Sequence, residues 1–206
     1  MKREFEQGAL EKLGEDYWKN YAGGRGPHDP DSVLSPEEIF GDLAEAGIEI
    51  AGQRVLDLGC GPGHYVRLFR ERGANAFGID ISPKAFELAA PEVRPYLYHL
   101  DIENLEIFPD RAFDLALHNA AVYLHPEALA AHFAELFRVL AGHLYLHVIS
   151  SDHPFWCSLD RERYAPYPGR PADWWVQTVE GAGFALTKVF DHPGWSWWML
   201  FGKRKS

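Results

Sequence analysis

The sequence has few cysteines and no long run of apolar residues. Its 206 residues include two cysteines, Cys60 and Cys157, too few for a disulfide framework and not at a spacing typical of a zinc site. No uncharged apolar stretch is long enough for a transmembrane helix. The first ten residues, MKREFEQGAL, lack the apolar core of a signal peptide. These absences predict a cytoplasmic protein with no metal site and no membrane partner.

Positive charge is also scarce. Twenty Lys and Arg residues stand against thirty Asp and Glu residues, which gives a formal net charge of −10. An acidic protein repels nucleic-acid phosphates, and the basic tail KRK at 203–205 is too short to reverse this. We therefore expect no nucleic-acid partner. The length fits one globular domain with a full-sized core.

The most informative stretch is VLDLGCGPG at residues 55–63. A short apolar run typical of a buried strand has Asp57 near its end, and glycines follow at Gly59, Gly61 and Gly63. Glycine lets the backbone turn sharply and approach a ligand closely. The amphipathic pattern that follows predicts a helix. In such a strand, glycine loop and helix unit, a ligand binds beyond the carboxyl end of the strand.

The spacing of the glycines indicates the class of ligand. A dinucleotide fingerprint reads G-x-G-x-x-G and binds a pyrophosphate, whereas this loop reads G-C-G-P-G and an acid precedes it. A carboxylate there would repel a pyrophosphate and suit a cation. The stretch resembles the first motif of the class I S-adenosylmethionine-dependent methyltransferases, acid-x-Gly-x-Gly-x-Gly. The cofactor of that family carries an ammonium and a sulfonium and no phosphate.

Strands and helices alternate along the rest of the chain. After the glycine loop, apolar runs predict strands at 76–79, 96–100, 113–119 and 143–150. Helical spacing predicts a helix over about 126–140, ended by Gly142. The alternation predicts an α/β fold with a doubly wound, mostly parallel sheet. The final runs FALTKVF and WSWWMLF indicate an antiparallel hairpin, and the resemblance implies a seven-stranded sheet whose last strand is inserted antiparallel.

The residues before the first strand predict an added helical layer. Helical spacing favours a helix at 4–20, and Ser35, Pro36 and Glu38 supply a cap, a first-turn proline and a capping-box acid for a helix at 36–46. The predicted single domain, 1–206, thus has three parts: an N-terminal helical layer (1–50), a cofactor-binding core (53–150), and a substrate loop, helix and terminal hairpin (151–206).

The resemblance implies that the methionine part of S-adenosylmethionine lies over the glycine loop. The loop backbone that would hold it belongs to Gly59, Cys60, Gly61 and Gly63. Asp57 would bind the ammonium, directly or through water. In the family, the residue at the end of the fourth strand lies near the methionine end, and here that is His118 or Asn119.

The resemblance also implies positions for the rest of the cofactor. Asp80 would accept both ribose hydroxyls, and Ile81 would lie against the adenine. Asp101 would accept the adenine amino group, while the N–H of Ile102 reaches a ring nitrogen. Two alternatives stay open. Asp80 could instead cap the helix that begins after Ser82, and Asp101 could be a turn residue.

Methyl transfer itself requires mainly that donor and acceptor are aligned and that water is excluded from the site. A base is needed only when the acceptor loses a proton, and histidine suits that task near neutral pH. Three candidates fall on loops predicted at the active face: His118, His125 and His153. Asp152 adjoins the last of them. Each of these histidines could also be structural.

We expect the acceptor pocket between the N-terminal layer, residues 120–126 and residues 151–170. Aromatic residues are dense there and in the next helix, namely Phe155, Trp156, Tyr164, Tyr167, Trp174 and Trp175. Such a pocket favours a small, flat or apolar acceptor, or an amine. We predict methyl transfer to a small molecule by a monomer or homodimer. A methyltransferase of protein or RNA, and an S-adenosylmethionine-binding protein without activity, remain alternatives.

Overall fold

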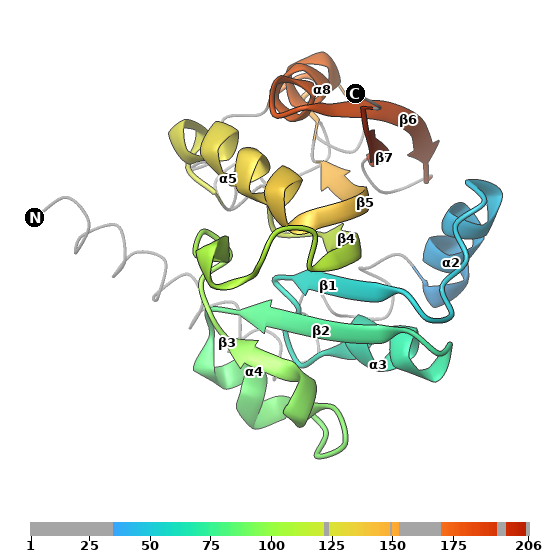
Figure 1. Ribbon diagram of the computed structural model, residues 1–206, viewed down its shortest axis with the longest axis vertical. Helices are drawn as coiled ribbons and strands as arrows, with labels where there is room; N and C mark the ends of the chain where they lie inside the picture. Colours follow the sequence, from blue (N-terminus) through green and yellow to red (C-terminus); the bar gives the residue numbers. More distant parts are fainter. Residues whose placement is uncertain (1–34, 122–123, 149, 153–169, 193–196, 205–206) are drawn as a thin grey trace, which may run out of the picture.

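Seven strands form one sheet in the computed structural model, which describes residues 35–121, 124–148, 150–152, 170–192 and 197–204 (Figure 1). The strands are β1 (Arg54–Leu58), β2 (Asn75–Asp80), β3 (Leu97–His99), β4 (Phe113–His118), β5 (Leu140–Val148), β6 (Phe184–Asp191) and β7 (Trp197–Lys203). Their order is β3-β2-β1-β4-β5-β7-β6. β1 to β5 pair in parallel, and β7 is antiparallel to both β5 and β6. The predicted mostly parallel sheet with an inserted antiparallel last strand is confirmed.

Helices cover both faces of this sheet. They are α2 (Pro36–Glu45), α3 (His64–Glu71), α4 (Pro83–Leu88), α5 (Pro126–Val139) and α8 (Ala172–Gly181). Since neighbouring residues of a strand point to opposite faces, Val55 belongs to the core cluster that includes residues of α2 and α3, and Leu56 belongs to the cluster that includes residues of α5 and α8. Within the described ranges, no helix combines the length and apolar composition that crossing a membrane requires.

The start of α2 follows from its first four residues. The Ser35 Oγ accepts the Glu38 N–H at 3.2 Å, and the Glu38 carboxylate accepts the Ser35 N–H at 2.6 Å. This capping box satisfies two donors at the helix start. α2 ends at Glu45, Ala46 is its C-cap, and Gly47 after it takes a left-handed φ of 74°. The helix predicted at 36–46 is confirmed.

The expectation that Gly142 ends the long helix is wrong. α5 ends at Val139 and β5 begins at the next residue, so Gly142 lies inside the strand. A Cβ at Gly142 would stand 2.4 Å from the backbone oxygen of Asp114 on β4. The β4–β5 register shifts between Phe113 and Leu115, around this contact. Glycine is needed here because two strands approach closely.

The remaining expectations for the fold divide into three groups. β3 is shorter than the pattern at 96–100 suggests, because Tyr96 belongs to the 3-10 helix η2 (Arg94–Tyr96). Trp198 on β7 is buried and stacks on Tyr145 of β5, with ring centroids 4.7 Å apart, so it is a core residue. The helix predicted at 4–20, the aromatic residues at 155–167, Cys157 and Trp195 lie outside the described residues.

Candidate active site

The carboxyl ends of β1, β2 and β4 meet at one edge of the sheet. Leu58 at the end of β1 is paired with Ile79 on β2 and with His118 on β4. The glycine loop, Asp80 and Asn119 therefore begin or flank the connections at the same edge. In doubly wound sheets this edge is where ligands bind.

The glycine loop, residues 59–63, is packed closely against the segments around it. Gly59 and Gly63 take left-handed φ angles of 74° and 82°. A Cβ at Gly59 would lie 2.5 Å from the Cβ of Ala120, and one at Gly63 would lie 2.7 Å from a methyl carbon of Val93. Larger residues would therefore push the loop out of position, in addition to the strain of a positive φ.

Cys60 contributes its backbone to this loop, while its side chain points into the core. Its thiol is buried, and burial raises its pKa well above the ordinary value. A Cβ at Gly78 of β2 would stand 2.6 Å from the sulfur, so the thiol occupies the space that this glycine leaves open. Any contact of Cys60 with a cofactor would thus come from its main chain.

Asp57 is a buried carboxyl group directly before the loop. It is 2% exposed, and its Oδ2 has no hydrogen-bond partner among the described residues. Burial raises the pKa of Asp57 to about 8, and the nearby Asp80 carboxylate adds to the rise. An unpartnered buried carboxylate is costly, and a bound ammonium would remove that cost. The site therefore fits the cationic end of S-adenosylmethionine.

Asp80 at the end of β2 bonds to two backbone segments of the site. Its Oδ2 accepts the Gly61 N–H at 2.9 Å, and its Oδ1 accepts the Ser82 N–H at 2.8 Å. Burial raises its pKa, and these two hydrogen bonds act against that rise. The Ser82 side chain makes no capping bond to the described residues of α4, and the Asp80 bond goes to the N–H of Ser82, the residue before the helix. Each carboxylate oxygen can still accept a second donor, as ribose binding requires.

Ile81, the next residue, presents an apolar side chain to solvent. It is 49% exposed, and the His99 ring lies 2.8 Å from its carbonyl oxygen. Asp101 begins the connection after β3, and its Oδ1 accepts the Glu103 N–H at 3.0 Å, as expected of a turn residue. The Ile102 side chain belongs to the core on the α5 face. Only its backbone is therefore available to a ligand.

The end of β4 holds a buried pair of histidines. His118 is fully buried and points to the α5 face, where its Nε2 lies 2.9 Å from Nε2 of His132. Its Nδ1 accepts the Ala120 N–H at 3.3 Å. Burial lowers the pKa of His118 well below its usual range and that of His132 to about 4. His118 is thus a neutral interior residue, while Asn119 after it is half-buried.

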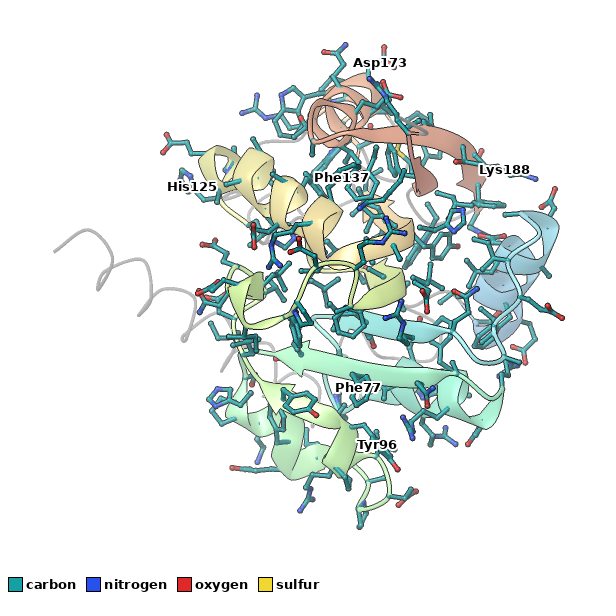
Figure 2. All side chains as sticks on the ribbon, in the orientation of Figure 1. Phe77, Tyr96, His125, Phe137, Asp173 and Lys188 are labelled. Carbon is teal, nitrogen blue, oxygen red and sulfur yellow. The ribbon has the colours of Figure 1, made fainter. Side chains whose placement is uncertain are left out.

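The other two predicted bases are placed differently. The His125 side chain is exposed at the start of α5, at the periphery of the molecule in Figure 2, and its Nδ1 lies 4.0 Å from a Glu127 oxygen. His153 lies outside the described residues. Asp152 accepts hydrogen bonds from Ser150 and from the Ala172 N–H, so it joins the end of β5 to the start of α8.

A second polar cluster joins α2 to the last strands. The Asp42 Oδ2 accepts from the Tyr145 hydroxyl at 2.5 Å and from the His192 Nε2 at 2.8 Å. Farther along, the Lys188 Nζ lies 2.6 Å from Glu45, and Figure 2 shows Lys188 on β6 beside α2. Neither this cluster nor His132 was among the residues that the sequence indicated. His132 does share the buried helix spacing of Leu129, Phe133 and Leu136, which signals burial but not the partner.

Residues 55–143 match a family model described as a methyltransferase domain. Over this segment the chain resembles methyltransferase domains. A malonyl-[acyl-carrier protein] O-methyltransferase of Serratia marcescens is 32% identical over 115 residues, which are 55% of this chain and 44% of that protein. The chain therefore spans less than half the length of this curated relative.

Solved structures resemble the chain over more of its length. The 1,6-didemethyltoxoflavin-N1-methyltransferase of Burkholderia thailandensis, with bound 1,6-didemethyltoxoflavin and S-adenosylhomocysteine, has a TM-score of 0.72 and 20% identity and covers 97% of this chain and 90% of its own. The magnesium protoporphyrin IX methyltransferase of Synechocystis PCC 6803, with bound S-adenosylhomocysteine, has a TM-score of 0.66 and 15% identity and covers 82% and 81%. At these identities the likeness establishes the fold.

Proposed function

We propose that this chain is a methyltransferase that transfers a methyl group from S-adenosylmethionine to a small-molecule acceptor. Asp57 is the observation that supports this most directly. Its buried Oδ2 has no hydrogen-bond partner in the described part of the chain, and it lies at the carboxyl end of β1, directly before the glycine loop. A pyrophosphate at this place would face a carboxyl group, whereas an ammonium would pair with it.

The methionine and ribose parts of the cofactor are assigned to residues around the glycine loop. S-adenosylmethionine would supply a methyl group that its sulfonium already activates. The backbone of residues 59–63 would bind the methionine part, and Asp57 would bind its ammonium. Asp80 would accept the two ribose hydroxyls while it keeps its bonds from Gly61 and Ser82.

The adenine is assigned to the connections after β2 and β3. Ile81 would cover one face of the ring, which accounts for an apolar side chain exposed at this edge. The Asp101 Oδ1 accepts the Glu103 N–H, so its other carboxylate oxygen would accept the adenine amino group. The backbone N–H of Ile102 would donate to a ring nitrogen. Asn119, at the end of β4, would lie near the methionine end.

For the acceptor we propose a small, flat molecule. The two solved relatives are named for toxoflavin and protoporphyrin substrates, both ring compounds. The net charge of −10 disfavours RNA. A second candidate is an acyl group on a carrier protein, because the Serratia relative is named for such a substrate. A cytoplasmic location and a monomer or homodimer stay predictions.

The three predicted histidines are proposed for different tasks. His118 uses both ring nitrogens inside the protein, so we assign it to the support of the site rather than to proton removal. His125 has an exposed ring at the start of α5 and stays a candidate base for acceptors that lose a proton. His153 stays a candidate from its place in the sequence alone.

Calorimetric titration with S-adenosylmethionine, S-adenosylhomocysteine and NAD, in parallel, tests the cofactor. We expect micromolar binding of the first two and no binding of NAD. Acceptor screening with methyl-labelled cofactor then follows, with ring compounds in one set and acyl-carrier protein thioesters in the other. Cofactor binding without transfer to either set would favour a non-catalytic binding protein. Binding of NAD alone would contradict the proposal.

A further inference from the structure

The histidine pair joins the end of β4, beside the glycine loop, to the middle of α5. His118 ends β4, and His132 lies near the middle of α5, one helix turn after Leu129 of the buried core. Both rings are buried, and their Nε2 atoms are 2.9 Å apart. The methyl donor needs neither ring directly, because both face the α5 side of the sheet. Any role of the two rings in the site must therefore come from the backbone groups that they contact.

The positions of the protons follow from the contacts. The Ala120 N–H donates to Nδ1 of His118, so this nitrogen carries no proton. A neutral His118 then carries its proton on Nε2 and donates it to Nε2 of His132, which leaves the His132 proton on Nδ1. The Nδ1 of His132 has no hydrogen-bond partner among the described residues, and the nearby Ile102 backbone raises the pKa of His132 against the effect of burial.

One end of this chain of contacts belongs to the proposed site. Ala120 lies directly against the glycine loop, since a Cβ at Gly59 would meet its side chain at 2.5 Å. The two rings therefore join α5 to the backbone beside the methionine end of the cofactor.

We propose that His132 is a positioning residue for the cofactor. Through His118 it fixes the backbone at Ala120. The inference rests on the proposed function for its cofactor, and the placement of the Ala120 backbone is testable without any ligand. Neutral rings suit this task because each can donate and accept one hydrogen bond at the same time.

The test compares three variants in the same chain. His132→Leu removes both ring nitrogens and leaves the His118 Nε2–H without an acceptor. His132→Gln keeps an acceptor near the position of Nε2. Phe133→Leu is the matched control, because it shortens a neighbouring buried side chain whose ring packs against both histidines and leaves every ring nitrogen of the pair in place. Thermal unfolding first establishes that all three variants fold.

Hydrogen exchange of the ligand-free proteins is the first measurement. We expect His132→Leu to raise the exchange rate of the Ala120 amide at least tenfold relative to Phe133→Leu, and His132→Gln to restore most of the protection. Calorimetry with S-adenosylhomocysteine is the second. We expect about a tenfold weaker affinity for His132→Leu and a change of less than threefold for the other two variants.

The outcomes separate this inference from the proposed function. If His132→Leu and Phe133→Leu give equal exchange at Ala120, the pair is only part of the core and the inference is wrong. Unchanged affinity in His132→Leu with increased exchange would also contradict it, because the held backbone would not matter to the cofactor. If the unmodified chain fails to bind the probe, the proposed function fails, and the inference falls with it whatever the exchange data show.

Discussion

Asp42 and Asp57 are both buried carboxyl groups on the side of the sheet that α2 and α3 cover, yet the protein surrounds them differently. Asp42 accepts hydrogen bonds from Tyr145 and His192. The Oδ2 of Asp57 accepts none from the described residues, and burial raises its pKa to about 8. A buried acid that the fold satisfies stabilises the fold. One that it leaves unsatisfied is explained by a ligand that supplies the missing donor.

This contrast predicts that replacing Asp57 weakens cofactor binding, whereas replacing Asp42 lowers the stability of the fold. Asp57→Ala should give the largest effect. We expect its affinity for S-adenosylmethionine to fall about 100-fold, near 3 kcal/mol, since a charge-assisted hydrogen bond at a buried site is lost. The unfolding free energy should hold or increase, because an unsatisfied carboxyl has been removed. Calorimetry and urea unfolding measure the two quantities, and a loss of stability equal to the loss of affinity would break the contrast.

Asp42→Ala should show the reverse pattern. Its removal leaves the buried Tyr145 hydroxyl and the His192 Nε2 without their common acceptor, so we expect the unfolding free energy to fall by about 2–3 kcal/mol. Cofactor affinity of the folded fraction should change less than threefold. Urea unfolding checks the first number, and Asp42→Asn, which keeps an acceptor oxygen, should recover part of the loss. An affinity loss as large as that of Asp57→Ala would assign Asp42 to the site.

The raised pKa of Asp57 predicts linked proton release. With a folded pKa of about 8, above the ordinary carboxyl value, Asp57 is mostly protonated at pH 7 in the free protein. Its contribution to stability is present in acid and is lost as the pH rises through about 8. Pairing with an ammonium requires the ionised form, so binding at pH 7 should release close to one proton. Calorimetry in buffers of different ionisation enthalpy measures this number, and Asp57→Asn should release none.

Asp101→Ala should give the smallest effect. One oxygen of Asp101 already accepts the Glu103 N–H in a turn, so only part of the side chain is left for the adenine. We expect a two- to fivefold loss of affinity, below about 1 kcal/mol. Binding of S-adenosylhomocysteine by the variant tests this. A loss as large as that of Asp57→Ala would mean that the adenine end dominates cofactor recognition.

Local sequence patterns predicted those parts of the fold and of the site that depend on residues close together in the sequence. The capping box at Ser35, the strand before Asp57 and the glycine loop each need only a few consecutive residues, because caps and tight turns are local. The pattern of strand and helix also located Asp80 at the end of β2. Gly142 shows the limit of such reasoning. Its local pattern suggested a helix end, while the contact that requires glycine comes from Asp114 on another strand.

Hydrogen-bond partners that are distant in sequence could not be predicted from local patterns. Tyr145 is 103 residues from Asp42, and His192 is 150 residues from it. His118 was expected at the ligand edge, yet its side chain points to the buried face that α5 covers. Strand residues alternate between faces, so the choice depends on register and on what packs there.

By itself, the sequence determined the class of fold, the glycine loop and the acids at the carboxyl ends of the strands. These follow from hydrophobic spacing, from backbone conformations that glycine permits and from the topology of parallel strands. Only the tertiary structure decided which buried groups are satisfied. Asp42 accepts hydrogen bonds from two donors, His118 is hydrogen-bonded to His132, and the Oδ2 of Asp57 has no hydrogen-bond partner among the described residues. Burial and hydrogen bonding depend on residues that are distant in sequence, and these residues come into contact only when the chain folds.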